Sequence, residues 1–182
     1  MNNLQQTEKQ KSIVSSLKSM KDEQVISLIQ DFRENGELFI VEPLLEMIYS
    51  NRSFSLKETI LELVGDIKNQ DAAEIIAKTI QNHIGDQNTT ELLSACWQSN
   101  LDFSNYLPVF IEILCSSDYQ ASFEAFTVIE NSVGNIDKKS LDLYITTIES
   151  KLKIMPIEKQ SLLTETIVML ESFKRNGSEL VF

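Results

Sequence analysis

Glycine and proline are scarce in this chain of 182 residues, which has five glycines and three prolines. This scarcity argues against an extended disordered protein, and a hydrophobic content of 42% is enough for a continuous core. No apolar run has the length of a bilayer span, so we expect no contact with a membrane. The N-terminal residues lack the uncharged apolar core of a secretory signal, which predicts a cytoplasmic protein.

The side chains that carry most enzyme chemistry are also few. His83 is the only histidine, and we expect it to lie on the surface or at a helix end. Cys96 and Cys115 form no CxxC motif and fall in apolar helical stretches, so they are predicted to be buried, unbridged thiols. The sequence contains no glycine-rich phosphate loop, HExxH motif or calcium-binding loop. It therefore predicts no catalytic residue, no metal site and no cofactor.

Basic residues are nearly absent from the middle of the chain. Residues 58–130 hold two basic and twelve acidic side chains, whereas residues 1–57 have a balance of −1 and residues 131–182 a balance of 0. The formal net charge of −11 is thus concentrated in the middle. A negative field of this kind repels phosphate backbones, so we expect no nucleic-acid partner.

Apolar side chains recur with helical spacing along most of the chain. In one stretch they fall at Leu56, Ile60, Leu63, Val64 and Ile67. This spacing is typical of a helix with one buried face, and the same pattern resumes after a polar turn. Asp71 is expected to cap the helix that follows this turn, and Asp137 to cap a later helix.

The breaks between predicted helices recur at a nearly fixed interval. The first helix of each pair begins near residues 5, 38, 71, 105 and 137, so the spacings are 33, 33, 34 and 32. A period of this length indicates stacked helical hairpins. We therefore predict an all-α fold and a single helical-repeat domain over residues 1–182. Its hairpins are expected at about 5–34, 38–67, 71–99, 105–133 and 137–174.

Two segments resemble HEAT repeats. The junction LELVGDIKNQDA is similar to the short HEAT pattern LG-D-I-x-x-x-x-A, and LPVFIEILCSSDYQASFEAFTVI resembles LPxLLxLLxDxxxxVRxxAxxAL. The resemblance covers about residues 20–175. It implies a right-handed α–α superhelix (a solenoid) in which the second helices of successive hairpins line the concave surface. Tetratricopeptide repeats share the period, but their Trp-Leu-Gly-Tyr pattern does not occur in register.

The candidate binding surface consists of the faces of these second helices that point away from the apolar stripes. Its main residues are Glu58, Leu61, Glu62, Glu91, Phe123, Phe126 and Glu130. An acidic surface with aromatic side chains suits a basic amphipathic segment, so we predict a non-catalytic scaffold that binds a protein or peptide. In the alternative interpretation, Phe123 and Phe126 pack between hairpins and the acidic residues form an ordinary solvated face.

An enzyme is the competing hypothesis, because HEAT-like scaffolds also occur in DNA glycosylases and bilin lyases. The resemblance to a glycosylase would imply a basic concave surface with an Asp and a Trp. Trp97 is the only tryptophan, and it aligns with Val64 and Ile129 in the apolar stripes, so we predict that it is a core residue. The acidic middle of the chain also argues against DNA, and no residue set in the chain identifies a lyase.

Overall fold

The computed structural model describes residues 3–35 and 37–176, which form ten α-helices and contain no strand. The first five helices are α1 (Asn3–Leu17), α2 (Asp22–Asn35), α3 (Val41–Ile48), α4 (Phe54–Asp66) and α5 (Ala72–Asn82). The others are α6 (Thr89–Gln98), α7 (Leu107–Ser116), α8 (Tyr119–Ser132), α9 (Lys138–Leu152) and α10 (Ile157–Asn176). Short 3-10 turns precede α3 and α7 and follow α8. The prediction of an all-α fold is confirmed for the described residues.

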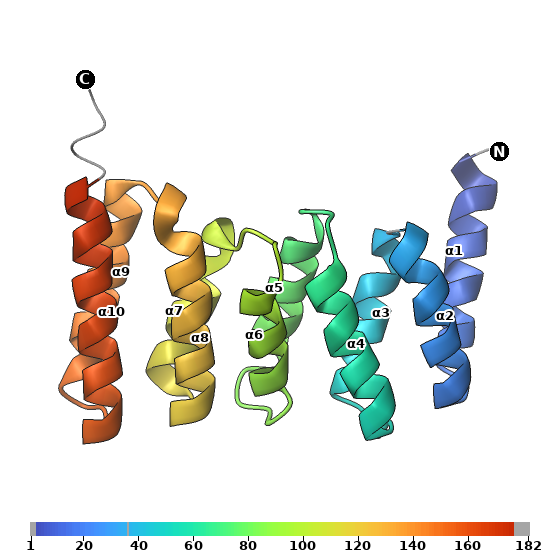
Figure 1. Cartoon of the computed structure of the whole chain (residues 1–182), viewed down its shortest axis with the longest axis horizontal. Helices are drawn as coiled ribbons and strands as arrows, with labels where there is room; N and C mark the ends of the chain where they lie inside the picture. Colours follow the sequence, from blue (N-terminus) through green and yellow to red (C-terminus); the bar gives the residue numbers. More distant parts are fainter. Residues whose placement is uncertain (1–2, 36, 177–182) are drawn as a thin grey trace.

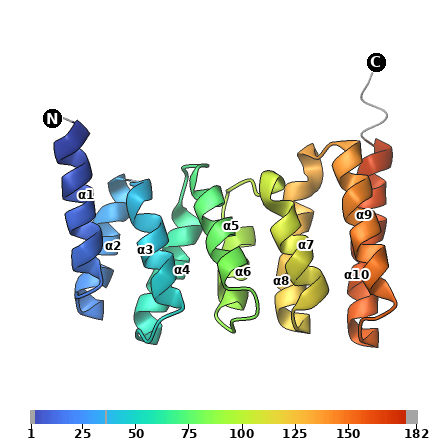
Figure 2. The same ribbon diagram turned by 180° about the vertical axis from the view of Figure 1, so that it is seen from behind.

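The helices lie side by side in two rows (Figure 1). The even row contains α2, α4, α6, α8 and α10, each packed on the next, and α3, α5, α7 and α9 pack in the same way in the odd row. Figure 2 shows the odd row from the other side, with α1 at one end of the molecule and α9 and α10 at the other. Each even helix from α4 onward also packs on the odd helix that precedes it.

Apolar stripes of the two rows meet in one continuous core. Four residues of the predicted stripe, Leu56, Ile60, Leu63 and Val64, are buried on α4. The fifth, Ile67, follows the end of α4 and is only half-buried. Each buried side chain of this kind contributes about 1.5–3 kcal/mol when it leaves water. Phe103 and Phe110, both fully buried, pack edge to face with ring centroids 5.5 Å apart.

Side-chain caps fix the starts of several helices. Asp137 accepts a hydrogen bond from the backbone N–H of Ser140 at 3.1 Å, as the sequence predicted. The prediction for Asp71 is wrong, because its side chain caps nothing in α5. Asp71 already has helical backbone angles (φ −62°, ψ −19°). A capping residue usually has an extended backbone, from which its side chain accepts an N–H of the first helical turn that follows. The Asn69 side chain instead accepts the backbone N–H of Asp71 at 3.1 Å.

Arg52, in the turn before α4, ties the first hairpin to the second. Its Nη1 donates to the carbonyl of Met20 at 2.7 Å and to Asp22 Oδ1 at 2.9 Å, and its Nη2 donates to the carbonyl of Lys18 at 3.0 Å. Hydrogen bonds from Ser53, and then from Arg52, lower the pKa of Asp22 to about 2. The carboxylate form of Asp22 is therefore held in place by the turn that it contacts.

Cys96 and Cys115 are both buried and unbridged, which confirms that prediction. Burial raises the pKa of both thiols, so the reactive thiolate form is disfavoured. None of the helices in the described part of the chain has the length and apolar character needed to cross a bilayer.

Candidate binding groove

An open groove of about 610 Å³ runs between the exposed faces of α4 and α6. From α4 it is lined by Glu58, Leu61, Glu62, Gly65 and Asp66, and from α6 by Glu91, Ser94, Ala95 and Gln98. Arg33 of α2 completes the lining. We call this the acidic groove. It brings together four of the seven residues that the sequence predicts for a binding surface.

Small residues keep the acidic groove open. Gly65 has no side chain, and a Cβ atom added there would meet no other atom within 4 Å. Ser94 and Ala95 stand opposite on α6, and Ala95 is buried at 7% exposure. Helices that pack in the same row therefore leave a hollow at this point, because no large side chain fills it.

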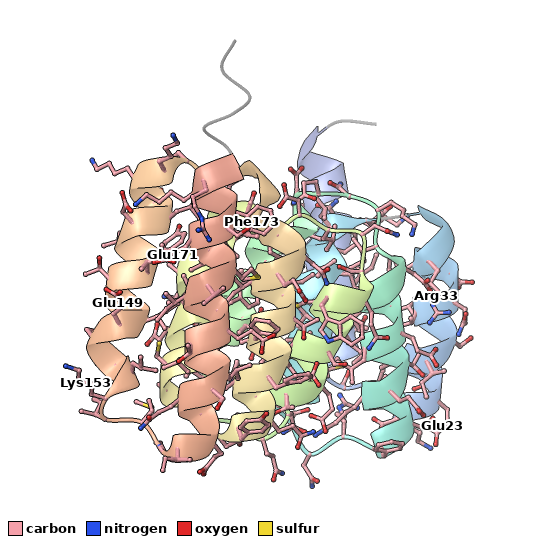
Figure 3. The ribbon with its side chains drawn as sticks, turned by 60° about the vertical axis from the view of Figure 1, so that its left-hand side comes forward. Glu23, Arg33, Glu149, Lys153, Glu171 and Phe173 are labelled. Atoms are coloured by element: carbon pink, nitrogen blue, oxygen red, sulfur yellow. The ribbon has the colours of Figure 1, made fainter. Side chains whose placement is uncertain are left out.

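Four exposed carboxylates face this hollow against a single cation. They belong to Glu58, Glu62, Asp66 and Glu91. Arg33, labelled on α2 in Figure 3, pairs with two of them: its Nη2 lies 3.0 Å from Glu62 Oε2 and its Nη1 lies 3.5 Å from Asp66 Oδ2. The groove keeps an excess of three negative charges, so its potential attracts cations.

The helix ends strengthen this negative potential. Neither α4 nor α6 carries a basic residue in its last turn. The C-terminal carbonyls of a helix act as a partial negative charge of about −0.5, which a nearby Lys or Arg usually offsets. On α4 this end is paired with Arg33 of α2, through Asp66.

The other three predicted residues lie on α8 and do not line the acidic groove. Phe126 is 9% exposed and belongs to the core, as the packing interpretation predicts, whereas Phe123 is 47% exposed. The two rings are in contact range, with centroids 6.4 Å apart. Glu130 is exposed. An aromatic floor made by both phenylalanines is therefore not present in the groove.

Trp97 is not a core residue, and the prediction that it is one is wrong. Its side chain is 37% exposed, and its Nε1–H donates to Glu124 Oε2 on α8 at 2.6 Å. The alignment with Val64 and Ile129 takes no account of two properties of tryptophan. Its ring is larger than these side chains, and its N–H needs a hydrogen-bond acceptor. An indole at the margin of the buried stripe satisfies both by lying across the surface between α6 and α8.

His83 lies at the C-terminal cap of α5, in agreement with the expected position at a helix end. Its ring stacks on Tyr49 with centroids 3.7 Å apart, and its Nε2 lies 3.3 Å from Glu46 Oε2. The backbone carbonyl of His83 accepts the Thr89 hydroxyl at 2.8 Å. These contacts hold the turn between α5 and α6, and burial raises the pKa of Tyr49. They account for His83 without a catalytic role.

Arg33 and Asp66 line the acidic groove but are absent from the binding surface that the sequence predicts. Arg33 lies 29 residues before Glu62 and 33 before Asp66, which is about one repeat, so the period itself was the available signal. Within the described ranges no three His, Cys, Asp or Glu side chains cluster as a metal site would require. Comparisons with models of protein families, with curated proteins and with solved structures found no match to this chain.

Proposed function

We propose that the protein is a non-catalytic scaffold whose acidic groove binds a basic segment of a protein or peptide partner. The observation that supports this proposal is the lining of the groove, where four carboxylates face one guanidinium across a hollow of about 610 Å³. Surface carboxylates are common, but four that line one hollow wide enough for side chains favour a site for cations over an ordinary solvated face.

Charge and shape have separate roles in this proposal. The carboxylates of Glu58, Glu62 and Glu91 steer a cationic segment toward the groove and fix its position. The half-buried Leu61 and the small Ala95 supply an apolar floor, on which the aliphatic part of a lysine or arginine side chain can pack. Binding of this kind is fast and depends on ionic strength.

The arrangement of the helices supports the HEAT-like part of the proposal. Two rows of helices, with each hairpin packed on the next, are what stacked helical repeats require. We assign residues 1–182 to one right-handed α–α superhelix of HEAT-like hairpins, acting in the cytoplasm. In such arrays the second helices line the concave surface, and the acidic groove lies on two of these helices.

A selection from displayed random peptides tests the proposal. Peptides are selected on the full chain and counter-selected on the variant E58Q/E62Q/E91Q, which keeps the size of the three side chains and removes their charge. We expect enriched peptides to contain clustered lysine and arginine, and to bind the native protein about tenfold more tightly than the variant at low salt. Enriched peptides that lack basic residues, or that bind both proteins equally, would contradict the proposal.

A further inference from the structure

A second hollow, of about 300 Å³, lies between α2, α3 and the C-terminal end of α4. Six of its lining residues are apolar, namely Phe32, Leu38, Ile40, Val41, Leu63 and Ile67, and the other five are Arg33, Glu37, Asp66, Lys68 and Asn69. We call it the apolar pocket. Three of these side chains, Ile40, Val41 and Leu63, are buried core residues, so the bottom of the pocket is rigid. Its volume lies at the lower limit for small-molecule sites, about 300–1,000 Å³, and suits a single large side chain.

The apolar pocket and the acidic groove share a wall. Arg33 and Asp66 line both hollows, and their side chains form an ion pair at 3.5 Å. The two hollows are therefore adjacent, on the two sides of this ion pair. An apolar pocket beside a charged groove is the usual arrangement in which one side chain anchors a partner while charges orient it.

The wall between the two hollows is held in place by ion pairs. Both terminal nitrogens of the Arg33 guanidinium are paired, Nη2 with Glu62 and Nη1 with Asp66. The side chain that separates the pocket from the groove is therefore fixed from the α4 side.

We propose that the apolar pocket binds a leucine-like or larger apolar side chain of the same basic segment, next to its cationic residues. This inference rests on the proposed function, because it assigns both hollows to one partner. It narrows the partner motif to an apolar residue followed or preceded by lysine or arginine.

Nuclear magnetic resonance titration of the ¹⁵N-labelled full chain tests the inference with three peptide probes. Each peptide is also made with its residues in the reverse order. The probes are N-acetyl-Leu-Lys-Lys-amide, N-acetyl-Gly-Lys-Lys-amide and N-acetyl-Leu-Gln-Gln-amide. We expect the leucine–lysine peptide to shift the backbone amides of Leu38 and Ile67, which line the pocket. The glycine peptide is expected to bind about tenfold more weakly, because it lacks the buried methylene and methyl groups.

Two matched variants locate the effect. Ile67 and Ile75 are both half-buried isoleucines packed against the core, but only Ile67 lines the apolar pocket. Ile67→Ala should weaken the leucine–lysine peptide by about tenfold, whereas Ile75→Ala should leave its affinity unchanged.

The outcomes separate the two proposals. Equal binding of the leucine and glycine peptides, or unmoved amides at Leu38 and Ile67, would overturn the anchor while the acidic groove stands. Equal binding of the lysine and glutamine peptides would contradict the proposed function, because positive charge would then make no difference to binding. Equal effects of the two isoleucine variants would place the anchor outside the pocket and overturn the inference.

Discussion

Two neighbouring surfaces of the even row differ sharply, although α6 takes part in both. Between α4 and α6 lies the acidic groove, kept open by Gly65, Ser94 and Ala95. Between α6 and α8 the Trp97 indole reaches across and donates to Glu124 at 2.6 Å. The helices follow the same order in both places, but α6 packs more extensively on α8 than on α4. Helix spacing and the size of a few side chains together decide which surface is hollow.

This difference assigns separate roles to the two surfaces. The surface between α6 and α8 is bridged, and a side chain that faces it, such as Trp97, contributes to the stability of the array. The surface between α4 and α6 is unfilled and strongly charged, which contributes little to stability and suits a partner. Substitutions at the contact between α6 and α8 should therefore change stability, and substitutions of charged residues in the acidic groove should change binding.

The largest expected effect separates the two phenylalanines of α8. Phe126→Ala removes a ring that is 9% exposed and should lower the free energy of unfolding by about 3–5 kcal/mol. Phe123→Ala removes a ring that is 47% exposed and should cost less than about 1 kcal/mol. Urea unfolding of both variants measures the difference. Equal losses would show that the face of α8 is not divided between core and solvent.

A smaller effect is expected from breaking the bridge between α6 and α8. Trp97→Phe keeps an aromatic ring but removes the N–H that bonds Glu124, so stability should fall by about 1 kcal/mol. Glu124→Gln keeps an acceptor oxygen at the same place and should cost less. Urea unfolding monitored by circular dichroism gives the two values. Circular dichroism does not depend on the tryptophan that Trp97→Phe removes, so both variants can be measured in the same way. A neutral Trp97→Phe would mean that the bridge contributes nothing.

The smallest expected effect is a gain in stability within the acidic groove. Gly65 lies inside α4, and a Cβ atom there would touch nothing within 4 Å. Gly65→Ala should therefore stabilise the protein by about 0.5 kcal/mol, because alanine loses less backbone entropy in a helix. The melting temperature should rise slightly. A decrease would show that the groove is more closely packed than its open volume indicates.

Much of the fold could be predicted because apolar periodicity depends on local spacing. The stripe on α4, the cap at Asp137 and the buried thiols all follow from the residue itself and its helical neighbours. The failure at Asp71 has a different origin. Whether a capping residue is extended or already helical depends on the turn, and here the Asn69 side chain fixes that turn.

The site was predictable only in part for a related reason. Glu58, Glu62 and Glu91 fall on the outer faces of their helices, and helical spacing alone places them there. Whether Phe126 and Trp97 are buried depends on how closely α8 and α6 approach their neighbours. The spacing of apolar residues in the sequence gives no information on these distances. The apolar pocket joins residues from three helices, so only the packed structure reveals it.

A simple cationic peptide can distinguish the surface between α4 and α6 from the surface between α6 and α8, and the natural partner need not be known. Hexalysine is titrated into the ¹⁵N-labelled chain at low ionic strength, and the shifted amides are assigned to helices. Two variants of one position accompany the native protein: Gly65→Lys adds a cation to the groove, and Gly65→Gln adds a neutral side chain of similar length.

We expect the shifts to concentrate on the facing residues of α4 and α6, and affinity to fall about tenfold in Gly65→Lys but to change much less in Gly65→Gln. Shifts that spread evenly over α8 as well, or equal losses in both variants, would contradict the assignment of cation binding to the acidic groove.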